Sequence, residues 1–146
     1  MVRRDVAGAK IARATTWVDD AAARFGDDVE RFVADRDRRD LAIFYLFLAI
    51  QECVDLAAHW VVDSGWMAAD DAGSTFDELA SRGAFTPELA TTLRGAVGLR
   101  NRIAHGYAML DYRRVHEEAR AGVGSLRQFL AAVADAAGLE YPPDAR

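Results

Sequence analysis

The segment Leu41–Val62 constrains the fold more than any other part of the sequence, because apolar residues occupy more than one of its faces. Their spacing is that of a helix, and a helix that is apolar on several faces must be covered on several sides. The side chains that need this cover are Leu41, Phe44, Tyr45, Leu48, Val54, Leu56 and Trp60. We therefore expect a central helix, or a helix that a partner chain also buries.

Helical spacing and capping residues flank this segment on both sides. Before and at the start of the central segment we expect a helix over 5–25, a helical turn over 29–34 and a solvated mixed-charge helix start over 35–40. After it we expect a loop over 66–73 and three helices, which run from Ser74 to Gly83, from Thr86 to Gly106 and from Asp111 to Gly138. Gly122 and Gly124 each weaken the last helix by roughly 1 kcal/mol against alanine, and close packing would explain both. No strand alternation occurs, so we predict an all-α fold, an antiparallel bundle of about five helices.

The length of 146 residues and the hydrophobic content of 51% suffice for one well-filled core. We expect a single helical domain over 1–138 and a C-terminal tail over 139–146. The one cysteine, Cys53, cannot form an internal disulfide, which favours a reducing compartment. No signal peptide is recognisable, and the longest apolar run, Leu41–Ile50, has about half the length of a membrane span. These features predict a soluble, cytoplasmic protein.

The net charge of −5 argues against a protein that coats nucleic acid through its overall field, but it does not exclude a local basic site. The arginines available for such a patch are Arg94, Arg100, Arg102, Arg113 and Arg114. The sequence leaves open whether Arg94, Arg113 and Arg114 belong to the patch or are ordinary solvated helix residues.

The segment Leu99–Tyr107 concentrates polar chemistry at the end of an expected helix. On that helix Asn101 and His105 share a face one turn apart, whereas Arg100 lies about 140° around the axis from His105. Arginine binds phosphate oxygens in bidentate fashion, and histidine is the usual proton carrier in catalysis. This combination suits RNA cleavage. His105 would move a proton at the 2′-hydroxyl or the leaving 5′-oxygen, Arg100 would offset charge on the phosphorane, and Asn101 would orient a partner.

Neither a metal nor another cofactor is expected at this site. The three histidines are scattered without ligand spacing, and no cysteine pair exists, so a zinc site is not predicted. The polar residues of the central segment must be paired or face a cleft, and they are Gln51, Glu52, Asp55 and His59.

The pattern Arg100-x4-His105-x-Tyr107 resembles the Arg-x4-His-x-Tyr motif of HEPN-domain proteins, most closely the HepT-like toxins of bacterial and archaeal toxin–antitoxin pairs. The resemblance extends over most of the chain. It includes the apolar central helix with acidic residues over Leu46–Trp60, the segment Phe76–Leu79, the stretch Gly98–Tyr107 and Asp111.

The resemblance implies an all-α HEPN-like dimer that cleaves RNA without metal, with the two motifs facing each other across a cleft. Such a dimer would resolve the awkward placement of Arg100 and His105 around one helix. It also implies a partner, an MntA-like nucleotidyltransferase antitoxin that transfers AMP onto Tyr107. The added phosphate would block RNA and offset the arginine charge. No DNA partner is implied.

The sequence leaves open which acidic residue supports the motif and whether the protein is catalytic. In related proteins an acidic residue of the central helix approaches the motif, and Glu52 and Asp55 are both candidates, with Arg102 a further supporting residue. The alternative function is a non-catalytic HEPN module that binds a nucleotide or a nucleotidyltransferase partner. The intact Arg100 and His105 favour the ribonuclease.

Overall fold

The computed structural model describes residues 3–143, which form an all-helical chain without strands in that range. The elements are α1 (Arg4–Phe25), α2 (Val29–Ala34), α3 (Arg36–Asp63), α4 (Ala72–Ser81), α5 (Pro87–Gly106), the 3-10 turn η1 (Tyr107–Met109) and α6 (Tyr112–Ala136). The predicted all-α fold is confirmed.

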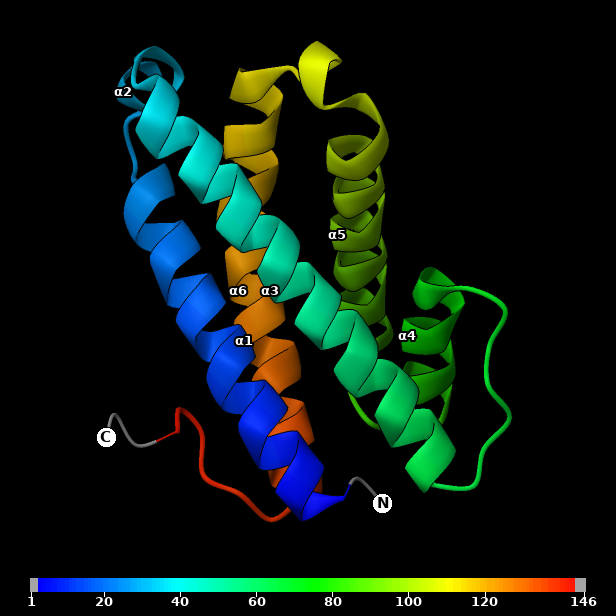
Figure 1. The fold of residues 1–146 in the computed structure, drawn as a ribbon. Helices are drawn as coiled ribbons and strands as arrows, with labels where there is room; N and C mark the ends of the chain where they lie inside the picture. Colours follow the sequence, from blue (N-terminus) through cyan, green and yellow to red (C-terminus); the bar gives the residue numbers. More distant parts are fainter. Residues whose placement is uncertain (1–2, 144–146) are drawn as a thin grey trace.

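Four long helices, α1, α3, α5 and α6, lie side by side and make the bundle (Figure 1). Helices α1 and α5 run in one direction and α3 and α6 in the other, so the bundle is antiparallel. The short α2 connects α1 to α3 at one end, and α4 packs against α5 and α3 near the other. The C-terminal end of α5, the turn η1 and the first turn of α6 lie at the same end as α2.

Helix α3 is central, because it packs against α1, α2, α4, α5 and α6. Its buried side chains include Ile43, Leu46, Ile50 and Leu56. By length and composition alone α3 could cross a membrane, with a mean hydropathy of 1.8 over its most apolar window, and core helices of soluble bundles pass the same test. One face is not covered within the chain, since Phe44 is 53% exposed.

The charged segment 35–40 is a solvated helix start over its first half only: Asp35, Arg36 and Asp37 are exposed, whereas residues 38–40 are half-buried. Asp35 caps α3 by accepting from the Arg38 backbone N–H (3.2 Å). The Arg38 side chain donates to the Arg24 and Ala23 carbonyl oxygens (2.9 Å each) and so completes the C-terminal end of α1. Arg39 lies 4.0 Å over the Tyr112 ring. The prediction therefore holds for residues 35–37 and fails for Arg38, Arg39 and Asp40, because long arginine side chains follow apolar and backbone surface instead of extending into water.

Most helix boundaries follow the predicted capping signals. Thr86 accepts from the Leu89 backbone N–H (3.1 Å), and Asp111 accepts from the Arg114 backbone N–H (3.3 Å). Helix α4 begins earlier than predicted, because Asp71 rather than a later residue provides its cap.

The glycines of α6 do not fill the role that the sequence suggested. A Cβ added at Gly122 or Gly124 would meet no atom within 4 Å, so close packing does not explain either residue. The residues after α6 pack rather than extend: Leu139 and Tyr141 lie against the core. The remainder of the predicted tail, 144–146, lies outside the described residues.

Candidate functional site

The last two turns of α5 present the predicted motif to one end of the bundle. Leu99 and Ile103 are buried (3% and 7% exposed) and fix the orientation of the helix. Because they face inward, Asn101 and His105 face solvent, and Arg100 lies at the boundary between them and the core. Helical periodicity alone therefore sorts this segment into an anchoring face and a polar face.

Arg100 is held by two amide oxygens. Its Nη1 donates to Gln51 Oε1 on α3 (2.9 Å), while Nε and Nη2 donate to Asn101 Oδ1 (3.2 and 2.8 Å). Asn101 therefore orients Arg100, which identifies the partner that the sequence analysis left unnamed. A guanidinium carries five N–H donors, so these bonds leave two donors for an incoming anion. Both fixing groups are neutral, and the charge of Arg100 is not offset by them.

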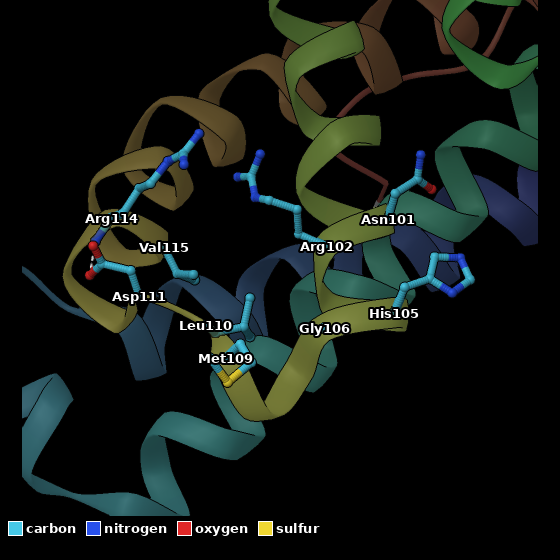
Figure 2. A pocket seen from close by; sticks show the side chains of 9 residues that line it. All are labelled: Asn101, Arg102, His105, Gly106, Met109, Leu110, Asp111, Arg114 and Val115. Carbon is cyan, nitrogen blue, oxygen red and sulfur yellow. Dashed lines mark hydrogen bonds between the residues drawn. The ribbon is translucent and has the colours of Figure 1, made fainter.

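His105 lies on the exposed side of α5. No hydrogen bond to its ring exists within residues 3–143, so both ring nitrogens are accessible. Figure 2 shows His105 and Asn101 on the same side of α5, as their spacing predicts, and Arg102 on the other side. Arg100 is directed toward α3, so the single chain does not bring its guanidinium and the His105 ring together through a hydrogen bond.

Tyr107 is the first residue of η1, directly after the end of α5. Burial, followed by a hydrogen bond with the Asp40 carboxylate and its charge, raises the pKa of Tyr107 to about 12. Asp40 is itself paired with Arg39 (3.2 Å between Nε and Oδ1). At neutral pH the Tyr107 hydroxyl is therefore protonated and faces a carboxylate that can accept its proton.

Arg102 points away from His105 and toward α6 (Figure 2). It forms an ion pair with Glu118, which also accepts from Arg114 Nε (2.9 Å). A cavity of about 510 Å³ opens here between the end of α5 and the start of α6. Its lining residues are Asn101, Arg102, His105, Gly106, Met109, Leu110, Asp111, Arg114 and Val115.

The other arginines of the proposed basic patch lie elsewhere. Arg94 pairs with Asp77 (2.8 Å), and Arg113 pairs with Glu30 (2.8 Å between Nη2 and Oε2). Of the flanking arginines, Arg102 and Arg114 are therefore the ones that line the cavity beside the motif.

The acidic candidates of the central helix face α1. Glu52 pairs with Arg13 (3.0 Å) and lies 3.7 Å from Lys10 Nζ, and Asp55 lies 3.6 Å from the same ammonium. A supporting role for Glu52 or Asp55 at the motif stays a prediction, and it competes with their ion pairs to α1. Cys53 between them is a fully buried core residue, and this burial raises the pKa of its thiol.

Two residues of α3 that the sequence did not assign to the motif, Gln51 and Asp40, interact with it; Gln51 was expected only to be paired or to face a cleft. They are eleven residues apart, about three helical turns, and so share one face of α3. Their spacing could therefore have indicated a shared face. Their residue types could not, because Gln51 is a neutral amide and Asp40 lies in a segment that is rich in charged residues. Among residues 3–143, no group of ligand side chains could hold a metal ion.

Fold and site together define a class: an antiparallel HEPN-like helical bundle with Arg-x4-His-x-Tyr at the end of one helix. The family model described as ribonuclease HepT-like matches residues 15–133. The chain therefore belongs to the HepT-like family. No curated protein matches the chain.

Solved structures of toxin–antitoxin proteins share the fold. A tri-AMPylated HEPN toxin from Shewanella oneidensis, in complex with its MNT antitoxin, is 24% identical with a TM-score of 0.81, covering 90% of this chain and 98% of that one. A toxin–antitoxin structure with AMP-PNP is 23% identical with a TM-score of 0.79, covering 88% and 98%. A mutant of the MntA–HepT pair is 24% identical with a TM-score of 0.78, covering 87% and 96%. At these identities the likeness shows a shared fold.

Proposed function

We propose that this protein is a metal-independent endoribonuclease toxin of a toxin–antitoxin system, acting in the cytoplasm. The observation that carries the proposal is the fixed Arg100. Two neutral amides, from Asn101 and Gln51, hold its guanidinium and leave two donors and a full charge on it, and His105 is exposed one turn beyond Asn101 on the same helix. Membership of the HepT-like family supports the same activity.

The chemistry requires one proton acceptor and one proton donor. A histidine takes the proton of the RNA 2′-hydroxyl, the 2′-oxygen attacks phosphorus, the bond to the 5′-oxygen breaks, and a histidine returns a proton to that leaving oxygen. The products are a 2′,3′-cyclic phosphate and a 5′-hydroxyl. Arg100 stabilises the charge that develops on the phosphorane oxygens.

A homodimer supplies the second histidine. Leu41, Phe44, Leu48 and Gln51 fall within roughly 80° of one another on α3, so the uncovered apolar face runs directly into the residue that holds Arg100. Leu41 and Phe44 are 43% and 53% exposed. A second copy packed on this face would cover them and bring two motifs together. Phe44→Glu is expected to give a folded monomer by analytical ultracentrifugation that no longer cleaves RNA, whereas a dimeric, active variant would exclude this interface.

AMPylation of Tyr107 by an MntA-like nucleotidyltransferase would switch the site off. The Tyr107 oxygen attacks the α-phosphorus of ATP, the bond to the β-phosphate oxygen breaks, pyrophosphate leaves, and Asp40 accepts the hydroxyl proton. Asp40 is suited to this role because it already faces that hydroxyl. The added phosphate places negative charge next to the basic site and excludes RNA. The fold relatives include a tri-AMPylated toxin bound to an MNT antitoxin, which supports this partner.

Cleavage of RNA by the purified, partner-free protein tests the activity directly. Wild type is expected to cleave and His105→Ala to be inactive while its far-ultraviolet circular dichroism is unchanged. If the two proteins treat RNA alike, the ribonuclease proposal is wrong. After incubation with the nucleotidyltransferase and ATP, mass spectrometry is expected to find AMP on Tyr107. A Tyr107→Phe protein that gains the same mass would exclude this tyrosine.

The second candidate is a non-catalytic HEPN module that binds a nucleotide or a nucleotidyltransferase. The 510 Å³ cavity beside Arg102 and Arg114 favours it, because a binding role needs only a cavity and cations. Nucleotide binding that persists in a protein without any RNA cleavage would favour this function over the ribonuclease.

A further inference from the structure

Two cavities follow one another along the line between α5 and α6. The first, of about 510 Å³, lies at the η1 end and has Leu110 and Val115 among its apolar walls. The second, of about 380 Å³, continues toward the middle of the bundle over a floor that includes Leu46 and Leu126. Arg102 and Arg114 line both cavities, so the two cavities adjoin at these arginines. We call the two cavities together the groove.

The groove lining holds two carboxylates, Asp111 and Glu118, beside its two arginines, and Asp111 caps α6 by accepting from the Arg114 backbone N–H (3.3 Å). The two arginines lie where the two cavities meet. Both pair with Glu118. Their side chains are 40% and 60% exposed, and Figure 2 shows them reaching from α5 and α6 toward the space between the helices. An arginine pair of this kind suits one phosphate group, because each guanidinium can present parallel N–H donors to its oxygens.

Glycines keep the second hollow open. Gly95 and Gly98 of α5 and Gly122 of α6 line it, and a Cβ added at any of them would meet no atom within 4 Å. Close helix packing therefore does not require glycine at these positions, although glycine weakens a helix. A larger side chain at Gly122 would occupy the hollow instead.

We propose that the groove between α5 and α6 binds a single-stranded segment of the RNA substrate next to the cleavage site. Arg102 and Arg114 hold one backbone phosphate, and the two apolar hollows take the bases on either side of it. Each volume lies in the range of small-molecule sites, and the first cavity borders Asn101 and His105 of the motif. The groove suits unpaired bases, whose faces stack on apolar surface when they are free of a duplex. This inference rests on the proposed ribonuclease function and names part of its substrate site.

The sharpest test fills the hollow without removing any contact. In a His105→Ala background, which allows binding to be measured without cleavage, Gly122→Leu is compared with Gly124→Leu. Both changes replace a glycine of the same helix by a better helix former, but only Gly122 lines the groove. We expect Gly122→Leu to weaken binding of a fluorescently labelled single-stranded RNA decamer about tenfold. Gly124→Leu should bind like its parent.

The arginine part is tested by a second matched pair. Arg114 lines the groove, whereas its neighbour Arg113 pairs with Glu30 elsewhere. Arg114→Ala is expected to weaken RNA binding and to lower the slope of log K against log salt by about one, because one phosphate contact is lost. Arg113→Ala should leave that slope unchanged.

Each outcome separates this inference from the ribonuclease proposal. If Gly122→Leu and Gly124→Leu bind RNA equally, the groove inference is wrong even when the wild type cleaves RNA. If Gly122→Leu weakens binding of the nucleotidyltransferase and not of RNA, the groove is a protein-docking surface and the RNA inference is also wrong. If the groove pair differs as expected but wild type never cleaves RNA, the groove stands and the ribonuclease proposal fails.

Discussion

Two polar clusters contain adjacent residues of α3 but connect this helix to different parts of the molecule. In the motif cluster (Asp40, Gln51, Arg100, Asn101 and Tyr107), α3 supports the end of α5 and the start of η1. In the α1 cluster (Lys10, Arg13, Glu52 and Asp55), α3 is tied to α1 by ion pairs. Gln51 and Glu52 are adjacent in sequence, but one residue along a helix turns the side chain by about 100°.

The two clusters differ in the groups that their arginines face. The α1 cluster has two cations and two carboxylates, so its charges offset one another and join two helices. In the motif cluster Arg100 is fixed only by amide oxygens, which accept its hydrogen bonds without offsetting its charge. A cation that is fixed but not neutralised is available to phosphate. The comparison predicts that changes in the motif cluster alter activity and changes in the α1 cluster alter stability.

The largest effect is expected at His105, which adjoins the motif cluster without a hydrogen bond to it. His105→Ala removes the proton carrier and is expected to lower the RNA cleavage rate by about 10²–10⁴-fold. Because the ring is exposed, the free energy of unfolding should change little. Gel-based cleavage rates and urea denaturation measure the two quantities. A large loss of stability would show that His105 has a structural role instead.

Gln51→Glu tests the charge argument most directly. The substitution keeps the acceptor for Arg100 Nη1 but adds a negative charge, so it pairs the Arg100 guanidinium with a carboxylate, as Arg13 is paired in the α1 cluster. We expect cleavage to fall about tenfold while the protein becomes no less stable, since the new pair is charge-assisted. Single-turnover cleavage and thermal unfolding check this. Cleavage at the wild-type rate would show that the free charge of Arg100 is not needed.

Asp40→Asn is expected to act on the tyrosine and not on RNA cleavage. Removing the carboxylate charge lowers the pKa of Tyr107 from about 12 toward its ordinary value, although burial, the first cause of the shift, persists. The substitution also removes the proposed acceptor of the hydroxyl proton. We therefore expect AMP transfer to slow several-fold, less than the roughly 10²–10⁴-fold that removal of a general base typically causes. Ultraviolet titration and mass spectrometry measure the two changes. Asp37→Asn, which removes an exposed carboxylate of the same helix and leaves Asp40 in place, is the control.

The raised pKa of Tyr107 also predicts a weak dependence of stability on alkaline pH. The folded pKa of about 12 exceeds the ordinary tyrosine value of 10.0, so the unfolded chain loses this proton first. The stabilising contribution is complete below pH 10 and is lost as the pH rises toward 12. Urea denaturation across this range should show a smaller decline in Tyr107→Phe than in wild type.

The smallest effect on activity is expected in the α1 cluster. Glu52→Gln removes a charge whose side chain is 13% exposed and that faces Lys10 and Arg13, so the free energy of unfolding should fall by about 1–2 kcal/mol. RNA cleavage should stay within about twofold of wild type, because the α1 cluster faces away from Arg100. A loss of cleavage beyond the loss of stability would place Glu52 in the supporting role that the sequence allowed.

The sequence by itself determined the helices and the local order of the motif. Helical spacing, Thr86 and Asp111 as caps, and the shared face of Asn101 and His105 are set by residues within about one turn of each other. Such short-range relations do not depend on where the other helices lie. For the same reason the buried face of α5 was predictable, since Leu89, Leu93, Val97 and Ile103 repeat with the helical period.

Only the tertiary structure decided which residues of α3 meet the motif. The rotation of α3 about its own axis is set by how Ile43, Leu46 and Ile50 pack against other helices. Because of this rotation Gln51 faces Arg100 and forms a hydrogen bond with it, whereas Glu52 faces α1 and forms an ion pair there. Such packing depends on side-chain shapes from distant segments, which spacing along one helix does not contain. The same reason explains why Arg38, Arg39 and Asp40 are half-buried and why Gly122 borders a groove.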